Sequence, residues 1–146
     1  MTAATVYCIF TPYTREREGR LIIRVDPADA RPIYRQVADE IKALIARGDL
    51  RQGEALPSVR QVAGDLGVNL NTIAAAYREL QEEGLISVRH GAGAQVTSRT
   101  TREAPRAELR RPLRTVLTQL VLAGLPRAEI LGLVERELKD LMKGER

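Results

Sequence analysis

The fold can be inferred first from residues 57–80, which read PSVRQVAGDLGVNLNTIAAAYREL. Ser58 is an N-cap candidate for a short helix, because its hydroxyl can accept a hydrogen bond from a free N–H of the first turn. Gly67 ends this helix, and a second helix is expected from about Asn71 to Glu83. Each helix has an apolar face with helical spacing, formed by Val59, Val62, Ala63 and Leu66 in the first and by Ile73, Ala76, Tyr77 and Leu80 in the second. Two short helices joined by a turn that contains glycine predict a helix-turn-helix.

The preceding segment predicts a further helix and a strand. Pro32 lies near the first turn of a helix that begins at Arg31-Pro32 and ends at Gly48, and residues 50–57 are expected to form a loop. Leu21 to Val25 is a short β-branched run, which is typical of a strand.

The following segment predicts a β-hairpin. Gly84 ends the second helix of the motif, and residues 85–88 and 95–97 predict two strands around a glycine-rich turn. A hairpin in this position forms the wing of a winged helix. We therefore expect a mainly α fold with a small β wing, in which residues 21–97 form a winged helix-turn-helix.

Three segments lie outside this domain. Residues 1–20 show no periodicity or capping signal and are expected to be a flexible N-terminal extension. Residues 98–112 are rich in Arg, Thr and Pro and predict a basic linker, which either strengthens DNA binding or is simply solvated. Residues 113–146 predict a two-helix hairpin, because two apolar stripes flank Gly124-Leu125-Pro126.

The two stripes of this C-terminal hairpin are too small to form a core of their own. They must pack on the winged helix of the same chain or on the hairpin of a second chain. The second arrangement makes the hairpin a dimerisation region. Its candidate interface residues are Leu113, Val116, Leu117, Leu120, Val121, Ile130, Val134, Leu138 and Leu141.

Composition restricts the chemistry of the chain. The 146 residues contain one Cys and one His, so an internal disulfide framework and a zinc site of soft ligands are not expected. No apolar run approaches the length of a membrane span, and residues 1–12 do not resemble a signal peptide. We expect a cytoplasmic protein without a metal or other cofactor.

Motifs of catalysis are not found either. The sequence has no glycine-rich phosphate loop, no HExxH motif and no recognisable pair of nucleophile and base. The net charge of +4 and the pI near 9.6 are compatible with a nucleic-acid partner. However, residues 25–97 contain 8 basic and 10 acidic side chains, so any DNA contact there depends on local placement.

Several motifs in order resemble the N-terminal domain of GntR-type bacterial transcription regulators. They are RPIYRQV at residues 31–37, GEALPSVR at 53–60, LGVNLNT at 66–72, YRELQEEGLI at 77–86 and GAGAQV at 91–96. Ala94-Gln95 departs from the usual pair of the family's wing. The short C-terminal region and the NLNT motif are most similar to the YtrA-type subfamily. This resemblance implies dimerisation through two C-terminal helices and repression of operons that encode ABC transporters.

The predicted start of the second motif helix carries the main candidates for DNA contact. In a helix-turn-helix the N-terminal residues of this helix face the base edges of the major groove. Asn71 can bond bases or phosphates, Thr72 can bond a phosphate, and Leu70 can make only an apolar contact such as that with a thymine methyl group. Asn69 is either the N-cap of the helix or a DNA contact.

Other candidates lie around this helix. The resemblance implies that Arg60 reads a base, typically guanine, while Ser58 is first an N-cap and only second a phosphate contact. Arg35 is a phosphate candidate. At the wing, Arg89, His90 and Gly91 are candidates for minor-groove or phosphate contacts, and His90 is the single histidine of the chain.

These observations predict a sequence-specific transcription regulator that is not an enzyme. We expect a dimeric repressor that binds double-stranded DNA as an inverted repeat, with half-sites about one helical turn apart. The small C-terminal hairpin offers little volume for a small-molecule effector, although such a ligand could bind between subunits. The alternative is a winged-helix module for protein–protein interaction, since a fold alone does not establish function.

Overall fold

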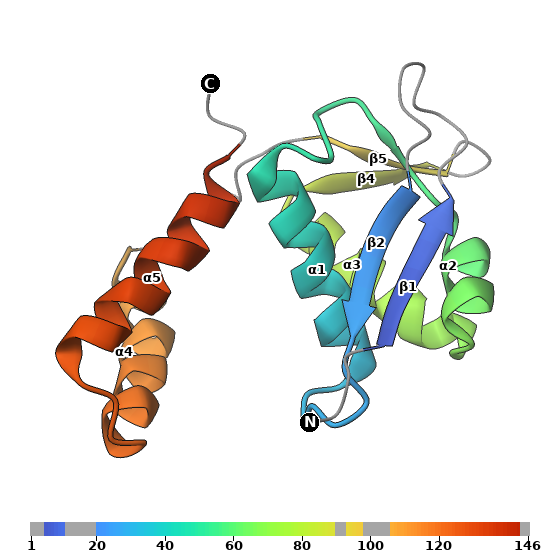
Figure 1. Cartoon of the computed structure of the whole chain (residues 1–146). Helices are drawn as coiled ribbons and strands as arrows, with labels where there is room; N and C mark the ends of the chain where they lie inside the picture. The colour runs from blue at the N-terminus through green and yellow to red at the C-terminus, as the bar shows by residue number, and fades with distance from the viewer. Residues whose placement is uncertain (1–4, 11–19, 90–92, 98–105, 144–146) are drawn as a thin grey trace.

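The computed structural model describes residues 5–10, 20–89, 93–97 and 106–143. Its elements follow the chain in the order β1 (Thr5–Phe10), β2 (Arg20–Val25), α1 (Ile33–Arg47), β3 (Ala55–Leu56), α2 (Val59–Leu66), α3 (Leu70–Glu82), β4 (Ile86–Arg89), β5 (Gly93–Val96), α4 (Arg106–Leu122) and α5 (Arg127–Leu141) (Figure 1). Helices α2 and α3 form the predicted helix-turn-helix, and β4 and β5 form the wing. The predicted fold class is confirmed.

One aliphatic core supports the winged helix-turn-helix. Helix α3 packs against both α1 and α2, and β2 lies against α1. The largest fully buried side chains come from these elements and from β5, and they are Ile23, Val37, Ile41, Ile45, Val62, Ile73, Leu80 and Val96. The helical positions among them recur at the spacing expected from the sequence, since one face of each helix must leave water.

The ends of the helices match their sequence signals. Gly48 and Gly67 follow α1 and α2 with φ of 80° and 64°, in the left-handed region that glycine adopts without strain. Ser58 caps α2, because its hydroxyl accepts a hydrogen bond from the Gln61 N–H at 3.1 Å. The predicted N-cap of α2 is therefore confirmed.

The wing is part of a three-stranded antiparallel sheet with the order β3-β5-β4. The sequence predicted only β4 and β5, and residues 50–57 were expected to be a loop. This expectation was wrong for Ala55–Leu56, which pair with Gln95 and Ala94. The pairing is held by the Gly53 N–H, which donates to the Val96 carbonyl at 2.8 Å, and by the Val96 N–H, which donates to the Glu54 carbonyl at 2.9 Å.

The expected flexible extension contains a strand. β1 pairs antiparallel with β2, from Thr5 opposite Val25 to Phe10 opposite Arg20. The two strands lie across the helices, with β2 beside α1 and β1 beside α2 (Figure 1). The physical reason is that a lone β2 would leave backbone groups without partners, whereas residues 5–10 are of strand-forming types and supply those partners.

The expected basic linker is also partly helical. Helix α4 begins at Arg106, so residues 106–112 belong to it, and Pro112 lies inside the helix. The segment before Pro112 contains good helix formers, and Glu108 in the first turn interacts favourably with the helix dipole. These preferences outweigh the breaking effect of Pro112 at this position.

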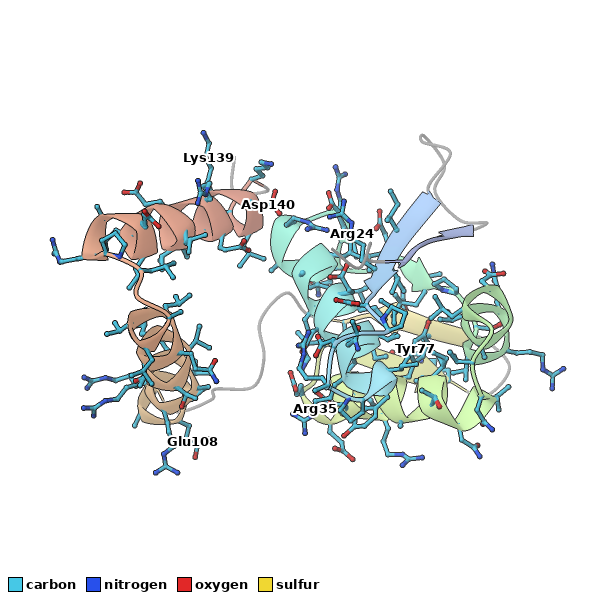
Figure 2. The ribbon with its side chains drawn as sticks, turned by 60° about the horizontal axis from the view of Figure 1, so that its bottom comes forward. Arg24, Arg35, Tyr77, Glu108, Lys139 and Asp140 are labelled. Carbon is cyan, nitrogen blue, oxygen red and sulfur yellow. The ribbon has the colours of Figure 1, made fainter. Side chains whose placement is uncertain are left out.

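The C-terminal hairpin stands beside the winged helix and has no core of its own (Figures 1 and 2). No residue of α5 is buried. Four of the predicted interface side chains are exposed, namely Leu113, Val116, Val121 and Leu138. The other five are half-buried, namely Leu117, Leu120, Ile130, Val134 and Leu141. The hairpin touches the winged helix where Arg47 Nη1 of α1 pairs with Asp140 Oδ2 of α5 at 3.3 Å.

In the described part of the chain, no helix is both long and apolar enough to cross a membrane. Within the same residues, no group of three or more His, Cys, Asp or Glu side chains could hold a metal ion.

Candidate nucleic-acid interface

The first turn of α2 presents Arg60 to solvent. The Ser58 cap fixes where this helix begins, and Arg60 follows two residues later. The Arg60 side chain is exposed and makes no hydrogen bond or ion pair with any residue that the structure describes. A guanidinium group that has no internal partner keeps all its N–H donors for an external acceptor such as guanine or phosphate.

The first turn of α3 gathers the four consecutive residues predicted to contact DNA. Asn69 is the N-cap, because its Oδ1 accepts a hydrogen bond from the Asn71 N–H at 2.8 Å. Leu70 and Asn71 are exposed, whereas Thr72 is half-buried. The structure thus assigns Asn69 a capping role, and the contacts of these four residues with DNA remain a prediction.

A buried hydrogen bond fixes α3 against the start of α2. Tyr77 Oη donates to the carbonyl oxygen of Pro57 at 2.6 Å, and Pro57 directly precedes the cap of α2. Burial raises the pKa of Tyr77, so the hydroxyl remains a neutral donor. The sequence predicted only a packing role for Tyr77. Its hydrogen bond could not be predicted, because the acceptor is a main-chain carbonyl 20 residues away in the sequence.

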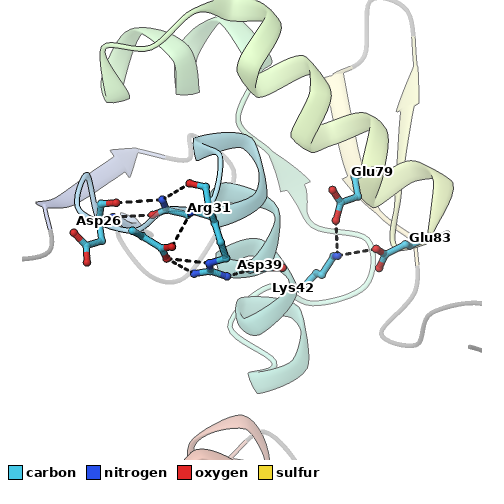
Figure 3. A network of polar contacts seen from close by, with 8 residues as sticks. Asp26, Arg31, Asp39, Lys42, Glu79 and Glu83 are labelled. Atoms are coloured by element: carbon cyan, nitrogen blue, oxygen red, sulfur yellow. Dashed lines mark hydrogen bonds and ion pairs between the residues drawn. The ribbon is translucent and has the colours of Figure 1, made fainter. Parts of the chain in front are cut away.

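Charge is distributed unevenly along α3. Its first eight residues contain no Asp or Glu, whereas Glu79, Glu82 and Glu83 lie at its C-terminal end. Lys42 of α1 bonds Glu79 Oε1 at 2.9 Å and Glu83 Oε1 at 2.7 Å (Figure 3). Partial burial lowers the pKa of Lys42, but the hydrogen bonds to the two carboxylates outweigh it and leave that pKa raised.

This distribution gives the two ends of α3 different affinities for a polyanion. The helix dipole makes the N-terminal end attractive to phosphate, and the glutamates make the other end repulsive. Of the two ends, the one around Leu70 and Asn71 suits contact with DNA.

Arg35 lies on α1, outside the helix-turn-helix. It is exposed in the first turn of α1, with its guanidinium 6.0 Å from the centre of the Tyr34 ring. A hydrogen bond with Tyr34 and the charges of Glu79 and Asp39 raise the pKa of Arg35. Its contact with a phosphate remains a prediction.

The wing holds one candidate that the structure describes. Arg89 is exposed at the end of β4, opposite Gly93 of β5. Two side chains anchor the base of this sheet, since Gln95 Nε2 donates to the Gly53 carbonyl at 2.7 Å and Thr97 Oγ1 donates to the Gly84 carbonyl at 3.0 Å. His90 and Gly91 lie outside the described residues.

A polar network that was not expected from the sequence holds the entry to α1. Gln36 is buried, and its Oε1 accepts from the Asp26 N–H at 2.8 Å. Its Nε2 donates to the carbonyl oxygens of Asp26 and Arg31, both at 3.1 Å. Arg31 in turn pairs with Asp29 and Asp39 (Figure 3). A buried amide that bonds the main chain in this way stabilises the turn before α1 but presents nothing to a ligand.

Comparison with known proteins identifies relatives of this chain. Residues 33–96 match the family model "Bacterial regulatory proteins, gntR family". The HTH-type transcriptional regulator YhcF of Bacillus subtilis (strain 168) is 36% identical over 115 residues, which are 78% of this chain and 89% of YhcF. The chain belongs to the gntR family. This family consists of DNA-binding transcription regulators rather than enzymes.

Two further relatives of this gntR-family chain are informative. The HTH-type transcriptional repressor YtrA of Bacillus subtilis (strain 168) is 38% identical over 76 residues, which are 52% of this chain and 58% of YtrA. The crystal structure of a transcriptional antiterminator from Listeria monocytogenes EGD-e superposes with a TM-score of 0.74 at 31% identity, over 84% of this chain and 93% of that one. The expected similarity to YtrA-type regulators is therefore confirmed.

Proposed function

We propose that this gntR-family chain is a dimeric repressor that reads an inverted-repeat operator in the cytoplasm. In each subunit the N-terminal end of α3 enters the major groove, and Arg60 contacts a base from the first turn of α2. The wing, including Arg89, His90 and Gly91, lies against the neighbouring minor groove or its phosphates. Arg35, exposed in the first turn of α1, is a further phosphate candidate.

The observation that carries this proposal is the exposure of polar side chains at the starts of α2 and α3, with the middle of α3 held to the start of α2 by Tyr77. Arg60 and Asn71 are exposed polar side chains on α2 and α3, and the bond from Tyr77 to the Pro57 carbonyl holds the two helices together. Prearranged donors without internal partners suit the recognition of base edges. A winged helix that only binds proteins would need neither Arg60 nor a polar end of α3.

Dimerisation is supported by the exposed apolar side chains of the C-terminal hairpin. Large side chains on both of its helices are exposed, and they include Leu109, Leu113, Val116, Val121, Leu131 and Leu138. Monomeric proteins rarely leave so much contiguous apolar surface in water. A second copy of the hairpin covers these side chains, and a small-molecule effector would bind between the two copies.

The sign of regulation and the kind of target come from similarity. YtrA of Bacillus subtilis is named a transcriptional repressor. A dimer on an operator represses by occupying the DNA that RNA polymerase needs. We propose an operon that encodes a transporter as the target, as the resemblance to YtrA-type regulators implies.

The proposal can be tested by selecting binding sites for the full-length chain from a pool of random double-stranded DNA. We expect one inverted repeat to be enriched and to bind one dimer, as measured by sedimentation. Its affinity should exceed that for scrambled DNA by at least about 10³-fold. Weak binding that selects no sequence, and that disappears equally for all DNA as the salt concentration rises, would contradict the proposed function.

A further inference from the structure

Leu70 is an exposed apolar side chain at the end of α3 that is proposed to enter the major groove. It is the first residue of the helix and is 45% exposed. Among the described residues of the winged helix, large exposed apolar side chains otherwise occur at Ile22, Ile33 and Val88, and none of these lies on α2 or α3. Leu70 is therefore the place where the helix-turn-helix presents apolar surface to a partner.

The folding tasks at the start of α3 are performed by other residues. Asn69 caps the helix through its bond from the Asn71 N–H. Val68, just before the cap, and Ile73, four residues after it, both pack with the core, as in a hydrophobic staple. Leu70 belongs neither to the buried core nor to the partly buried side chains packed against it, and the cap is made by Asn69.

The bases of DNA offer one apolar group in the major groove, the C5-methyl group of thymine. All the other groups that they present there are hydrogen-bond donors or acceptors. We infer that Leu70 reads a thymine through this methyl group, an inference that rests on the proposed function. Asn71 follows in the same turn with a free amide, which can bond N6 and N7 of adenine on a neighbouring base pair.

The inference is tested with sites that the full-length chain selects from random DNA. In each selected site, thymines are replaced one at a time by deoxyuridine, which removes the methyl group and leaves base pairing unchanged. We expect one thymine per half-site at which this replacement weakens binding by about fourfold, the effect of burying one methyl group. In the Leu70→Ala variant the same replacement should have no effect.

Two further variants separate base reading from a change in the fold. Ile22→Ala removes a side chain of similar exposure, 41%, from β2, and it should keep the full response to deoxyuridine. Leu70→Met restores apolar contact and should restore the response. Thermal melting of each variant shows that it is folded.

The outcomes distinguish this inference from the proposed function. The role of Leu70 is overturned if no replacement of thymine by deoxyuridine weakens binding, or if the same replacement still weakens binding in Leu70→Ala. Either result leaves the proposed function as a regulator unaffected. If no sequence is selected at all, the proposed function fails, and the role of Leu70 fails with it.

Discussion

The hydroxyl of Tyr77 donates a hydrogen bond to the carbonyl oxygen of Pro57 at 2.6 Å. This bond joins the inner face of α3 to the residue that precedes the cap of α2. The bond thus holds the middle of α3 against the start of α2, and so helps to position Asn71 relative to Arg60. The relationship links the stability of the domain to the geometry of its DNA-binding surface.

Removing this hydroxyl should destabilise the domain. In Tyr77→Phe the buried carbonyl of Pro57 loses its partner, and such a loss costs about 1–3 kcal/mol. Chemical denaturation measures the difference in the free energy of unfolding. An unchanged stability would mean that the bond contributes nothing. Because α2 also becomes less firmly held, we expect operator affinity to fall as well.

The same residue should make stability depend on alkaline pH. A tyrosine in the unfolded chain ionises near its ordinary pKa of about 10. Burial raises the pKa of Tyr77 in the folded state, so its contribution is complete below pH ~10 and is lost as the pH rises above that value. Lys42, whose pKa is also raised, adds to the loss in this alkaline range.

The difference between wild type and Tyr77→Phe isolates the contribution of the tyrosine. Denaturation at several pH values between about 8 and 11 should give a shallower decline for the variant. Parallel declines for the two proteins would show that Tyr77 titrates normally in the folded state.

The cap of α3 can be separated from a DNA contact by two substitutions at one position. Asn69→Ala removes the acceptor of the Asn71 N–H and should lower stability by about 1 kcal/mol. Asn69→Ser provides a new capping oxygen, so we expect it to recover both thermal stability and operator affinity. A serine variant that is stable but binds the operator poorly would show that the Asn69 amide contacts DNA directly.

The dimer should depend on exposed apolar residues of α4. Leu113 and Val121 are 55% and 62% exposed in one chain, so an aspartate at either position fits a folded monomer. In a dimer the new carboxylate would be buried against the partner without a counter-charge, which is costly. Sedimentation equilibrium should therefore show that Leu113→Asp and Val121→Asp are monomers.

The matched control for these variants is Gln119→Asp, which adds the same charge at an exposed position of α4 outside the apolar stripe. It should remain a dimer. The assignment of the interface is refuted if the wild-type chain is a monomer or if both stripe variants still dimerise.

Much of this structure was predictable because its signals are local. The cap at Ser58, the glycines at positions 48 and 67 and the helical spacing of the core residues each depend on a few neighbouring residues. Strand β3 was missed because its two residues form a strand only through pairing with β5. Residues 106–112 were assigned to a linker because their arginines suggested solvation, although they also favour helix.

The residues of the candidate site could be predicted from the sequence, but the contacts that hold their helices in place could not. The residues at the start of α3 follow from the motif, whereas the bond from Tyr77 and the pairing of Lys42 with Glu79 and Glu83 join residues distant in sequence. The spacing of apolar residues along the sequence does not predict contacts of this kind.

The central claim is that the starts of α2 and α3 read a DNA sequence. The most direct test is the affinity of Arg60→Ala for the selected operator and for scrambled DNA, at two salt concentrations. We predict a loss of about 1–3 kcal/mol on the operator and almost none on scrambled DNA. Arg24→Ala removes an exposed arginine from β2, and it should leave the preference for the operator unchanged. Equal losses on both DNAs for Arg60→Ala would contradict the claim.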